Sequence, residues 1–212
     1  MAEEGIDFET HNIKGTDIRV RKPVPRAERL LRKENLSDAL TGVGNYRALE
    51  RWLTQDQKRQ EHNYQSTQER RNEKFSYPTY GVAIFLDVDG LGNANEEGHE
   101  VGDTLIKCVA DAGKKITQRP NDAIFRRGDK SDEFIIFLPG DNLESFELLE
   151  KKYNEALLEK SGGRNFTASL ALGIYGHGRS AAETIKILDK ELSKEKSARG
   201  KGQHIETIFY RQ

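Results

Sequence analysis

The stretch from Tyr80 to Asp89, YGVAIFLDVD, is a short apolar run that ends in two acidic residues. A run of this length that is rich in β-branched and aromatic residues predicts a buried strand. Because the apolar run stops at Asp87 and Asp89, their carboxylates would lie at the edge of a sheet, where water and metal ions can reach them. The stretch therefore predicts a core strand with a candidate site at its end.

A second acidic pair follows a predicted hairpin. Residues 123–127 (AIFRR) and 132–139 (DEFIIFLP) read as strands, and the intervening residues 128–131 (GDKS) are typical of a turn. Asp132 and Glu133 open the second strand of this hairpin. If that strand neighbours the first run, Asp132 faces the same cleft as Asp87.

Carboxylates gathered in this way suggest chemistry with a hard metal ion. Oxygen ligands favour Mg²⁺ (or Mn²⁺) over softer metals. Metals held between carboxylates and a triphosphate are what phosphoryl and nucleotidyl transfer require. The alternative is that the acidic strand ends only keep the edges of the sheet soluble.

The remaining pattern predicts an α+β fold. Apolar residues recur at helical spacing in 102–116, 142–159 and 181–192, whereas 166–175 (FTASLALGIY) and 204–210 (HIETIFY) read as strands, the latter at an edge. The order helix, strand, helix, hairpin, helix, strand, helix, strand favours a mixed, mostly antiparallel sheet flanked by helices.

The start of the last helix carries its own signal. Ser180 and Glu183 have the spacing of a capping box, and Ile185, Leu188 and Leu192 then continue one apolar face. We therefore expect this helix to begin directly after Ser180.

Two polar regions flank or interrupt the pattern. Residues 1–35 read as a leader with a short helix over 26–36, before a domain that spans 36–212. Within that domain, residues 54–79 are almost wholly polar, and they form either a solvated helix or a mobile insertion.

Composition excludes several classes of protein. The 34 basic and 35 acidic side chains give a net charge of -1, which argues against a general binder of nucleic acids or membrane surfaces. A single Cys excludes a disulfide scaffold and a Cys-ligated zinc site. No apolar stretch approaches the ~20 residues of a membrane span, and no signal peptide opens the chain, so we expect a cytoplasmic protein with no sensor module.

Four blocks in order resemble the GGDEF family, the diguanylate cyclases. The third block departs from the family signature, since RGDKSDEF stands in place of RYGGDEF. The four blocks are Asp38–Arg47 (DALTGVGNYR), Asp87–Asp103 (DVDGL, then NE and GHEVGD), Arg127–Phe134 (RGDKSDEF), and Thr167–Ser169 with the later Asp189 and Lys196.

This resemblance implies a nucleotidyl-cyclase palm-like fold with a ferredoxin-like core, and it implies roles for single residues. Asp87, Asp132 and Glu133 would be catalytic; Asp87, Asp132 and the Val88 carbonyl would hold the metal. The nucleotide would be bound by the guanine-reading pair Asn95 and Asp103 and by phosphate-binding residues, namely Lys196, Arg199, Lys201, Lys130 and Ser131.

The implied activity is the condensation of two GTP molecules into cyclic di-GMP by a homodimer, in bacterial second-messenger signalling with an unknown effector. Two alternatives stay open: a synthase of another cyclic dinucleotide, adenine-containing or mixed, and a degenerate domain that binds nucleotide or a protein partner without turnover. No membrane or nucleic-acid partner is expected.

Arg119-Pro-Asn-Asp122 matches the family's R-x-x-D product-inhibition site. The alternative is an ordinary turn, because Pro, Asn and Asp are common turn residues.

Overall fold

The computed structural model describes residues 8–13, 16–21, 36–69, 80–140, 145–176, 178–199 and 207–210. The chain forms two compact units, 1–35 and 36–212. In the first unit, strands β1 (Phe8–Ile13) and β2 (Thr16–Arg21) pair antiparallel, with Ile13 opposite Thr16. The sequence analysis did not predict this hairpin, and nearly all of the helix predicted over 26–36 lies outside the described residues.

The second unit is built on a five-stranded sheet in the order β4-β5-β3-β6-β7. All neighbouring strands are antiparallel except β6 and β7, which are parallel. This arrangement confirms the predicted α+β fold with a mixed, mostly antiparallel sheet. The strands are β3 (Gly81–Val88), β4 (Ala123–Arg126), β5 (Glu133–Pro139), β6 (Ala168–Tyr175) and β7 (Ile208–Tyr210).

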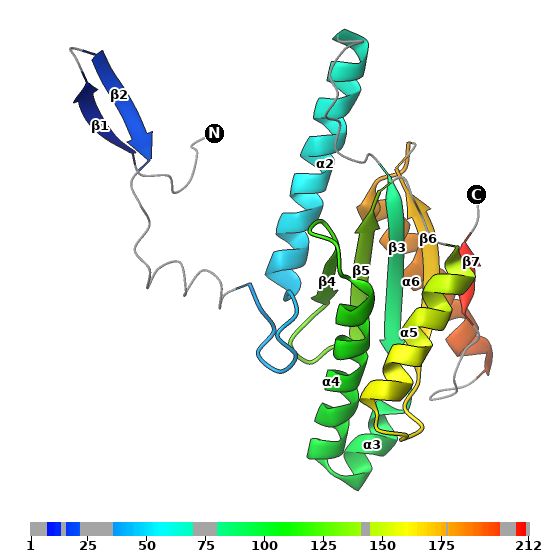
Figure 1. Cartoon of the computed structure of the whole chain (residues 1–212). Helices are drawn as coiled ribbons and strands as arrows, with labels where there is room; N and C mark the ends of the chain where they lie inside the picture. Colours follow the sequence, from blue (N-terminus) through cyan, green and yellow to red (C-terminus); the bar gives the residue numbers. More distant parts are fainter. Residues whose placement is uncertain are drawn as a thin grey trace. The chain divides into compact units, whose positions relative to one another are not determined.

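Helices cover both faces of this sheet, and Figure 1 shows α4 and α5 on the near face and α6 on the far face. Because side chains alternate along a strand, β3 serves two cores: Ile84 packs toward α4 and α5, whereas Phe85 packs toward α2 and α6. The helices are α2 (Tyr46–Glu69), α3 (Leu91–Glu97), α4 (His99–Ile116), α5 (Phe146–Lys160) and α6 (Ala181–Arg199).

The long helix α2 is held to the sheet through Trp52, whose ring stacks on Phe137 with 3.9 Å between centroids. Its chain stays helical as far as Glu69, which agrees with the helix alternative for the first part of the polar stretch. Residues 70–79 lie outside the described part of the chain.

The start of α6 confirms the predicted capping box. The Ser180 N–H donates to Glu183 Oε2 at 2.9 Å, and the Glu183 N–H donates to Ser180 Oγ at 3.2 Å. This cap fixes where α6 begins, and hence which of its residues reach the end of β3. Of the helices in the described residues, none is long and apolar enough to cross a membrane.

Candidate functional site

The candidate site lies where β3 ends beside the start of β5. Asp87 is the cross-strand neighbour of Glu133 on one side and of Ser169 on the other. The Val88 N–H donates to the Asp132 carbonyl at 3.0 Å, so the turn before β5 is bonded directly to the end of β3. The structure thus brings together the predicted catalytic and metal-binding residues, and a lysine 109 residues after Asp87 completes the group.

That lysine is Lys196, which α6 presents to the acidic end of β3. Its Nζ donates a short hydrogen bond to Asp87 Oδ1 and lies 3.4 Å from Asp89 Oδ1. The Asp89 side chain is 3% exposed and also accepts a hydrogen bond of 2.6 Å from Ser169 Oγ. The alternation of Asp87 and Asp89 predicted that both carboxylates lie at this edge of the sheet, but no signal in the sequence indicated that Asp89 pairs with Ser169.

The electrostatics at this end of the sheet favour a bound cation. Burial raises the pKa of Asp87 to about 6 because the charged carboxylate is poorly solvated there. The hydrogen bond and charge of Lys196 oppose this shift in the pKa of Asp87, whereas the negative charges of Asp132 and Glu133 add to it. A positive charge close to Asp87 therefore stabilises its ionised form.

A second basic residue, Arg127, occupies the side of the site next to β4. Its Nη1 lies 3.0 Å from Glu133 Oε2 and 2.9 Å from Asp189 Oδ2, and its guanidinium lies over the Phe85 ring at 5.5 Å. Arg127 thus connects β5, α6 and β3.

The contact with Asp189 fixes the position of Lys196. The two residues are seven positions apart on α6, which is about two helical turns, so they lie on the same face of the helix. When Arg127 holds Asp189 beside β5, the next two turns carry Lys196 to the end of β3. Arg127 is therefore a positioning residue for Lys196 and for Glu133.

Replacing Arg127 by Gln should loosen α6. The variant loses both ion pairs of a half-buried guanidinium. We therefore expect its free energy of unfolding to be lower than that of the wild type by about 1–2 kcal/mol. Amide hydrogen exchange should become faster in 181–199. As a control, Glu191→Gln removes an ion pair with Lys194 on the same helix and should leave this exchange unchanged; equal effects from both variants would contradict the assignment of Arg127.

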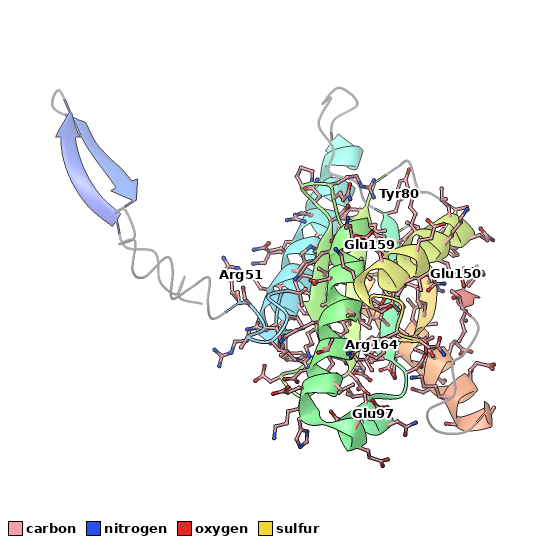
Figure 2. The ribbon with its side chains drawn as sticks, turned by 60° about the horizontal axis from the view of Figure 1, so that its bottom comes forward. Arg51, Tyr80, Glu97, Glu150, Glu159 and Arg164 are labelled. Atoms are coloured by element: carbon pink, nitrogen blue, oxygen red, sulfur yellow. The ribbon has the colours of Figure 1, made fainter. Side chains whose placement is uncertain are left out.

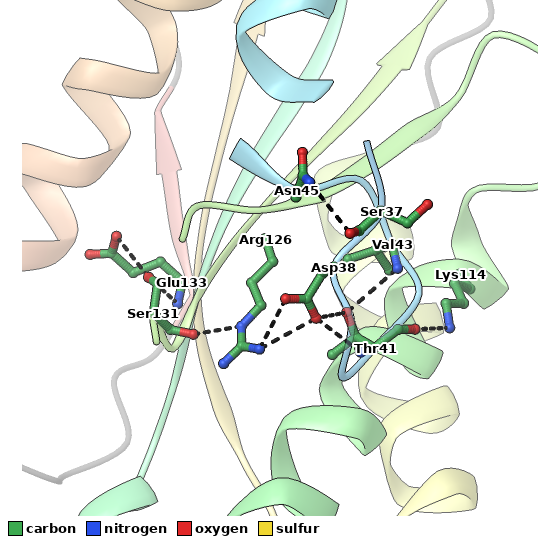
Figure 3. Close-up of polar contacts among 9 residues, drawn as sticks. All are labelled: Ser37, Asp38, Thr41, Val43, Asn45, Lys114, Arg126, Ser131 and Glu133. Carbon is green, nitrogen blue, oxygen red and sulfur yellow. Dashed lines mark hydrogen bonds and ion pairs between the residues drawn. The ribbon is translucent and has the colours of Figure 1, made fainter. Parts of the chain in front are cut away.

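The altered signature turn, residues 128–131, is held from inside by Ser131. Its N–H donates to the Gly128 carbonyl at 2.9 Å. Its Oγ accepts from the Glu133 N–H at 3.1 Å, and its carbonyl accepts from Arg126 Nε at 2.8 Å, as Figure 3 shows. Asp129 and Lys130 are exposed. The predicted phosphate contacts of Lys130 and Ser131 remain predictions.

The first sequence block contacts Arg126, whose side chain also donates a hydrogen bond to this turn. Asp38 is buried and lies 3.2 Å from Arg126 Nη1, with the two side chains 4% and 3% exposed. The Asp38 carboxylate also accepts hydrogen bonds from the N–H and Oγ1 of Thr41, at 2.9 and 2.6 Å. Lys114 Nζ donates to the Thr41 carbonyl at 2.6 Å, so α4 is tied to the same loop (Figure 3).

The predicted guanine-reading residues lie on the two helices that follow β3. Asn95 is on α3 and Asp103 is on α4, and both are exposed. A Cβ on Gly102 would approach Asn95 Oδ1 to 2.0 Å, so a glycine at this position allows α3 and α4 to come close together. The side chain of Arg199 and the whole of residue 201 lie outside the described part of the chain.

The residues predicted to bind the product inhibitor contact each other. The Arg119 N–H donates to Asp122 Oδ2 at 2.9 Å, and Arg119 Nε lies 3.2 Å from Asp122 Oδ1. These contacts are those expected if residues 119–122 form an ordinary turn. Arg119 and Asp122 both line a groove of about 550 Å³ between α4 and α5, together with Lys115 and Glu159, whose charged groups lie 3.7 Å apart. Figure 2 labels Glu159 on α5. Product binding in this groove stays a prediction.

The chemistry of the donor set fits a hard divalent cation. Asp87, Asp132 and the Val88 carbonyl offer oxygen ligands only, the kind that Mg²⁺ prefers. Among the residues that the structure describes, no group of three or more His, Cys, Asp or Glu side chains is arranged to hold a metal ion. The protein would therefore supply part of a coordination sphere and leave the rest to other oxygens.

Solved structures of other proteins share this fold. The diguanylate cyclase SiaD of Pseudomonas aeruginosa, solved with its activator SiaC, is 22% identical with a TM-score of 0.61, over 87% of this chain and 65% of SiaD. The coiled coil and GGDEF domain of DgcB from Caulobacter crescentus, in complex with c-di-GMP, is 19% identical with a TM-score of 0.63, over 87% and 90% of the two chains.

A microbial GGDEF domain described in a novel interaction mode with cyclic di-GMP is 21% identical with a TM-score of 0.60, over 85% of this chain and 99% of that one. Among curated proteins, none matches the chain. The family described as "Diguanylate cyclase, GGDEF domain" matches residues 35–202, which is most of the chain. With its sheet, its acidic strand end and its signature hairpin, the chain belongs to the GGDEF-domain family of diguanylate cyclases.

Proposed function

We propose that this protein is a nucleotidyltransferase that condenses two GTP molecules into cyclic di-GMP, with Mg²⁺ (or Mn²⁺) and as a homodimer. The observation that carries the proposal is the meeting of Asp87, Val88, Asp132 and Glu133 at one end of the sheet, opposite Lys196. Membership of the family and the likeness in fold to proteins that bind cyclic di-GMP support it.

The carboxylates would bind the metal ion, and the lysine would bind the phosphates. Asp87, Asp132 and the Val88 carbonyl would hold the metal, which when bound neutralises phosphate charge and helps to activate the attacking hydroxyl. Lys196 would pair with phosphate oxygens, because its ammonium is a compact charge on a flexible side chain. Glu133, held by Arg127 and Ser131, keeps a third negative charge beside the site.

Base selection is assigned to Asp103, with Asn95 beside it. A carboxylate can accept hydrogen bonds from both N1–H and the exocyclic amine of guanine, and adenine does not offer the two together. The exposure of both side chains is compatible with contact to a ligand. This is the physical reason for preferring GTP over ATP.

Dimerisation follows from the product. Each protomer would hold one nucleotide, and two protomers must face each other so that each 3′-hydroxyl attacks the α-phosphate in the other site. Each attack would form a bond between phosphorus and the 3′-oxygen, break the bond to the β-phosphate and release pyrophosphate. A product with two-fold symmetry fits a two-fold assembly.

The proposal is tested by incubating the protein with each NTP, and with pairs of NTPs, in Mg²⁺, and resolving the products by mass spectrometry. Cyclic di-GMP from GTP alone is the expected result. A cyclic product from ATP or from a mixture would instead support a synthase of another dinucleotide. No cyclic product from any combination would overturn the enzymatic proposal.

The exposed residues Asp129 and Lys130 in the signature turn favour a second candidate, a domain that binds nucleotide or a protein partner without turnover. Calorimetry with GTP, read together with the product assay, separates the two candidates. A degenerate domain would bind GTP and form no product.

A further inference from the structure

We infer that Lys196 is a built-in counter-ion that competes with free divalent cations for Asp87, so that the metal enters the site together with the nucleotide. The inference rests on the proposed function, because it concerns the order in which the metal and GTP bind at that site. It assigns Lys196 a role before the phosphates arrive, in addition to pairing with them.

The first argument is the position of the ammonium. Lys196 Nζ is bonded to Asp87 and lies 3.4 Å from Asp89 Oδ1, so it stands between the two carboxylates that end β3. A divalent cation bound to the Asp87 carboxylate would be within a few ångströms of this ammonium. Like charges so close together repel strongly in a site that is only partly solvated, so one of the two must leave.

The second argument is the number of oxygen ligands. Mg²⁺ takes six, and the protein offers Asp87, Asp132 and the Val88 carbonyl at this place. Among the described residues, no three Asp, Glu, His or Cys side chains are arranged to hold a metal ion by themselves. A free metal ion would gain few protein ligands and would have to displace Lys196. A metal–triphosphate complex brings phosphate oxygens of its own.

The third argument is where the displaced lysine goes. With α6 fixed by the Arg127–Asp189 ion pair, Lys196 can move by rotation of its side chain, which is 25% exposed. Beside a triphosphate the ammonium finds new anionic partners, so the exchange leaves no charge unpaired. Beside a free metal ion it gains no new anionic partner and keeps only Asp89, which it already contacts. The site therefore favours the metal–nucleotide complex over the metal alone.

The test uses Mn²⁺ as the probe and measures its binding to the full chain by calorimetry. The variants are Lys196→Met, which keeps much of the side-chain length without the charge, and Lys194→Met as the matched control, since Lys194 pairs with Glu191 on the same helix. Without nucleotide, we expect Lys196→Met to bind Mn²⁺ about tenfold more tightly than the wild type, and Lys194→Met to match the wild type.

A second measurement adds guanosine 5′-(α,β-methylene)triphosphate, which cannot release pyrophosphate. The order should then reverse, because Lys196→Met lacks the cation that pairs with the phosphates; we expect it to bind the Mn²⁺–analogue complex about tenfold more weakly than the wild type. Circular dichroism of each variant checks that it is folded.

Free Mn²⁺ binding by Lys196→Met that is equal to or weaker than that of the wild type, including no binding by either, overturns the inference. Failure of the proposed function gives a different result, the absence of any cyclic product from the wild type. Metal binding and product formation are separate measurements, so the two failures are distinguishable.

Discussion

Replacing Asp132 by Asn should lower the rate of cyclic di-GMP formation by a factor on the order of a thousand. The amide keeps the shape of the side chain but removes a negative metal ligand, and the electrostatic stabilisation of a phosphoryl transition state is the largest single contribution in sites of this kind. The Asp132 carbonyl, which accepts from the Val88 N–H, is unaffected, so the fold should remain intact. The measurement is the initial rate of product formation at saturating GTP and Mg²⁺.

Asp129→Asn is the matched control for this experiment. It makes the same chemical change three residues earlier, at an exposed position in the same turn, and its rate should stay within about twofold of the wild type. A fully active Asp132→Asn protein would contradict the metal assignment. Strong loss in both variants would instead point to the charge of the turn as a whole.

Replacing Asp38 by Ala should cost about 3–5 kcal/mol of unfolding free energy. Arg126 is 3% exposed, and the substitution would leave its guanidinium charged and buried with no carboxylate beside it. Two hydrogen bonds from Thr41 are lost as well. Urea unfolding followed by circular dichroism measures the change.

Lys151→Ala serves as the control, because Lys151 and Glu155 form an ion pair that is 70% and 65% exposed. Its removal should change the unfolding free energy by less than about 1 kcal/mol. A double variant, Asp38→Leu with Arg126→Met, should recover much of the lost stability, since a buried ion pair can be replaced by apolar residues at little cost. A loss below about 1 kcal/mol in Asp38→Ala would show that the pair does not hold the loop to the turn.

The sheet was predictable because its strands carry local signals. The run from Tyr80 to Asp89 is apolar on both faces, as a central strand must be, and the residues between 127 and 132 are turn formers. Two elements carried weaker signals. Helix α3 has only seven residues, fewer than two full periods of the helical pattern. Helix α2 has an apolar stripe only in its first turns, at Leu49, Trp52 and Leu53, and the rest of it is polar.

The site was predictable only where its residues are close together in the sequence or match a family motif. Asp87 and Asp132 end or open strands, which makes them visible as motifs. The pairings around them are not visible in the sequence: Arg127 meets Asp189 across 62 residues, and Asp89 meets Ser169 across 80. Such pairings depend on which strands become neighbours and on where α6 crosses the sheet, and both are properties of the tertiary structure.

The signature turn is longer than that of the family signature, and the strands on either side of it still pair. The Arg127 N–H still donates to the Glu133 carbonyl at 3.0 Å, so the hairpin pairing reaches the first residue before the turn. Ser131 closes the turn, and Asp129 and Lys130 form its solvent-facing tip. Because exposed loop tips tolerate change best, a fluorescent label attached to the side chain at position 129 would lie beside the site without breaking the Ser131–Gly128 hydrogen bond that closes the turn.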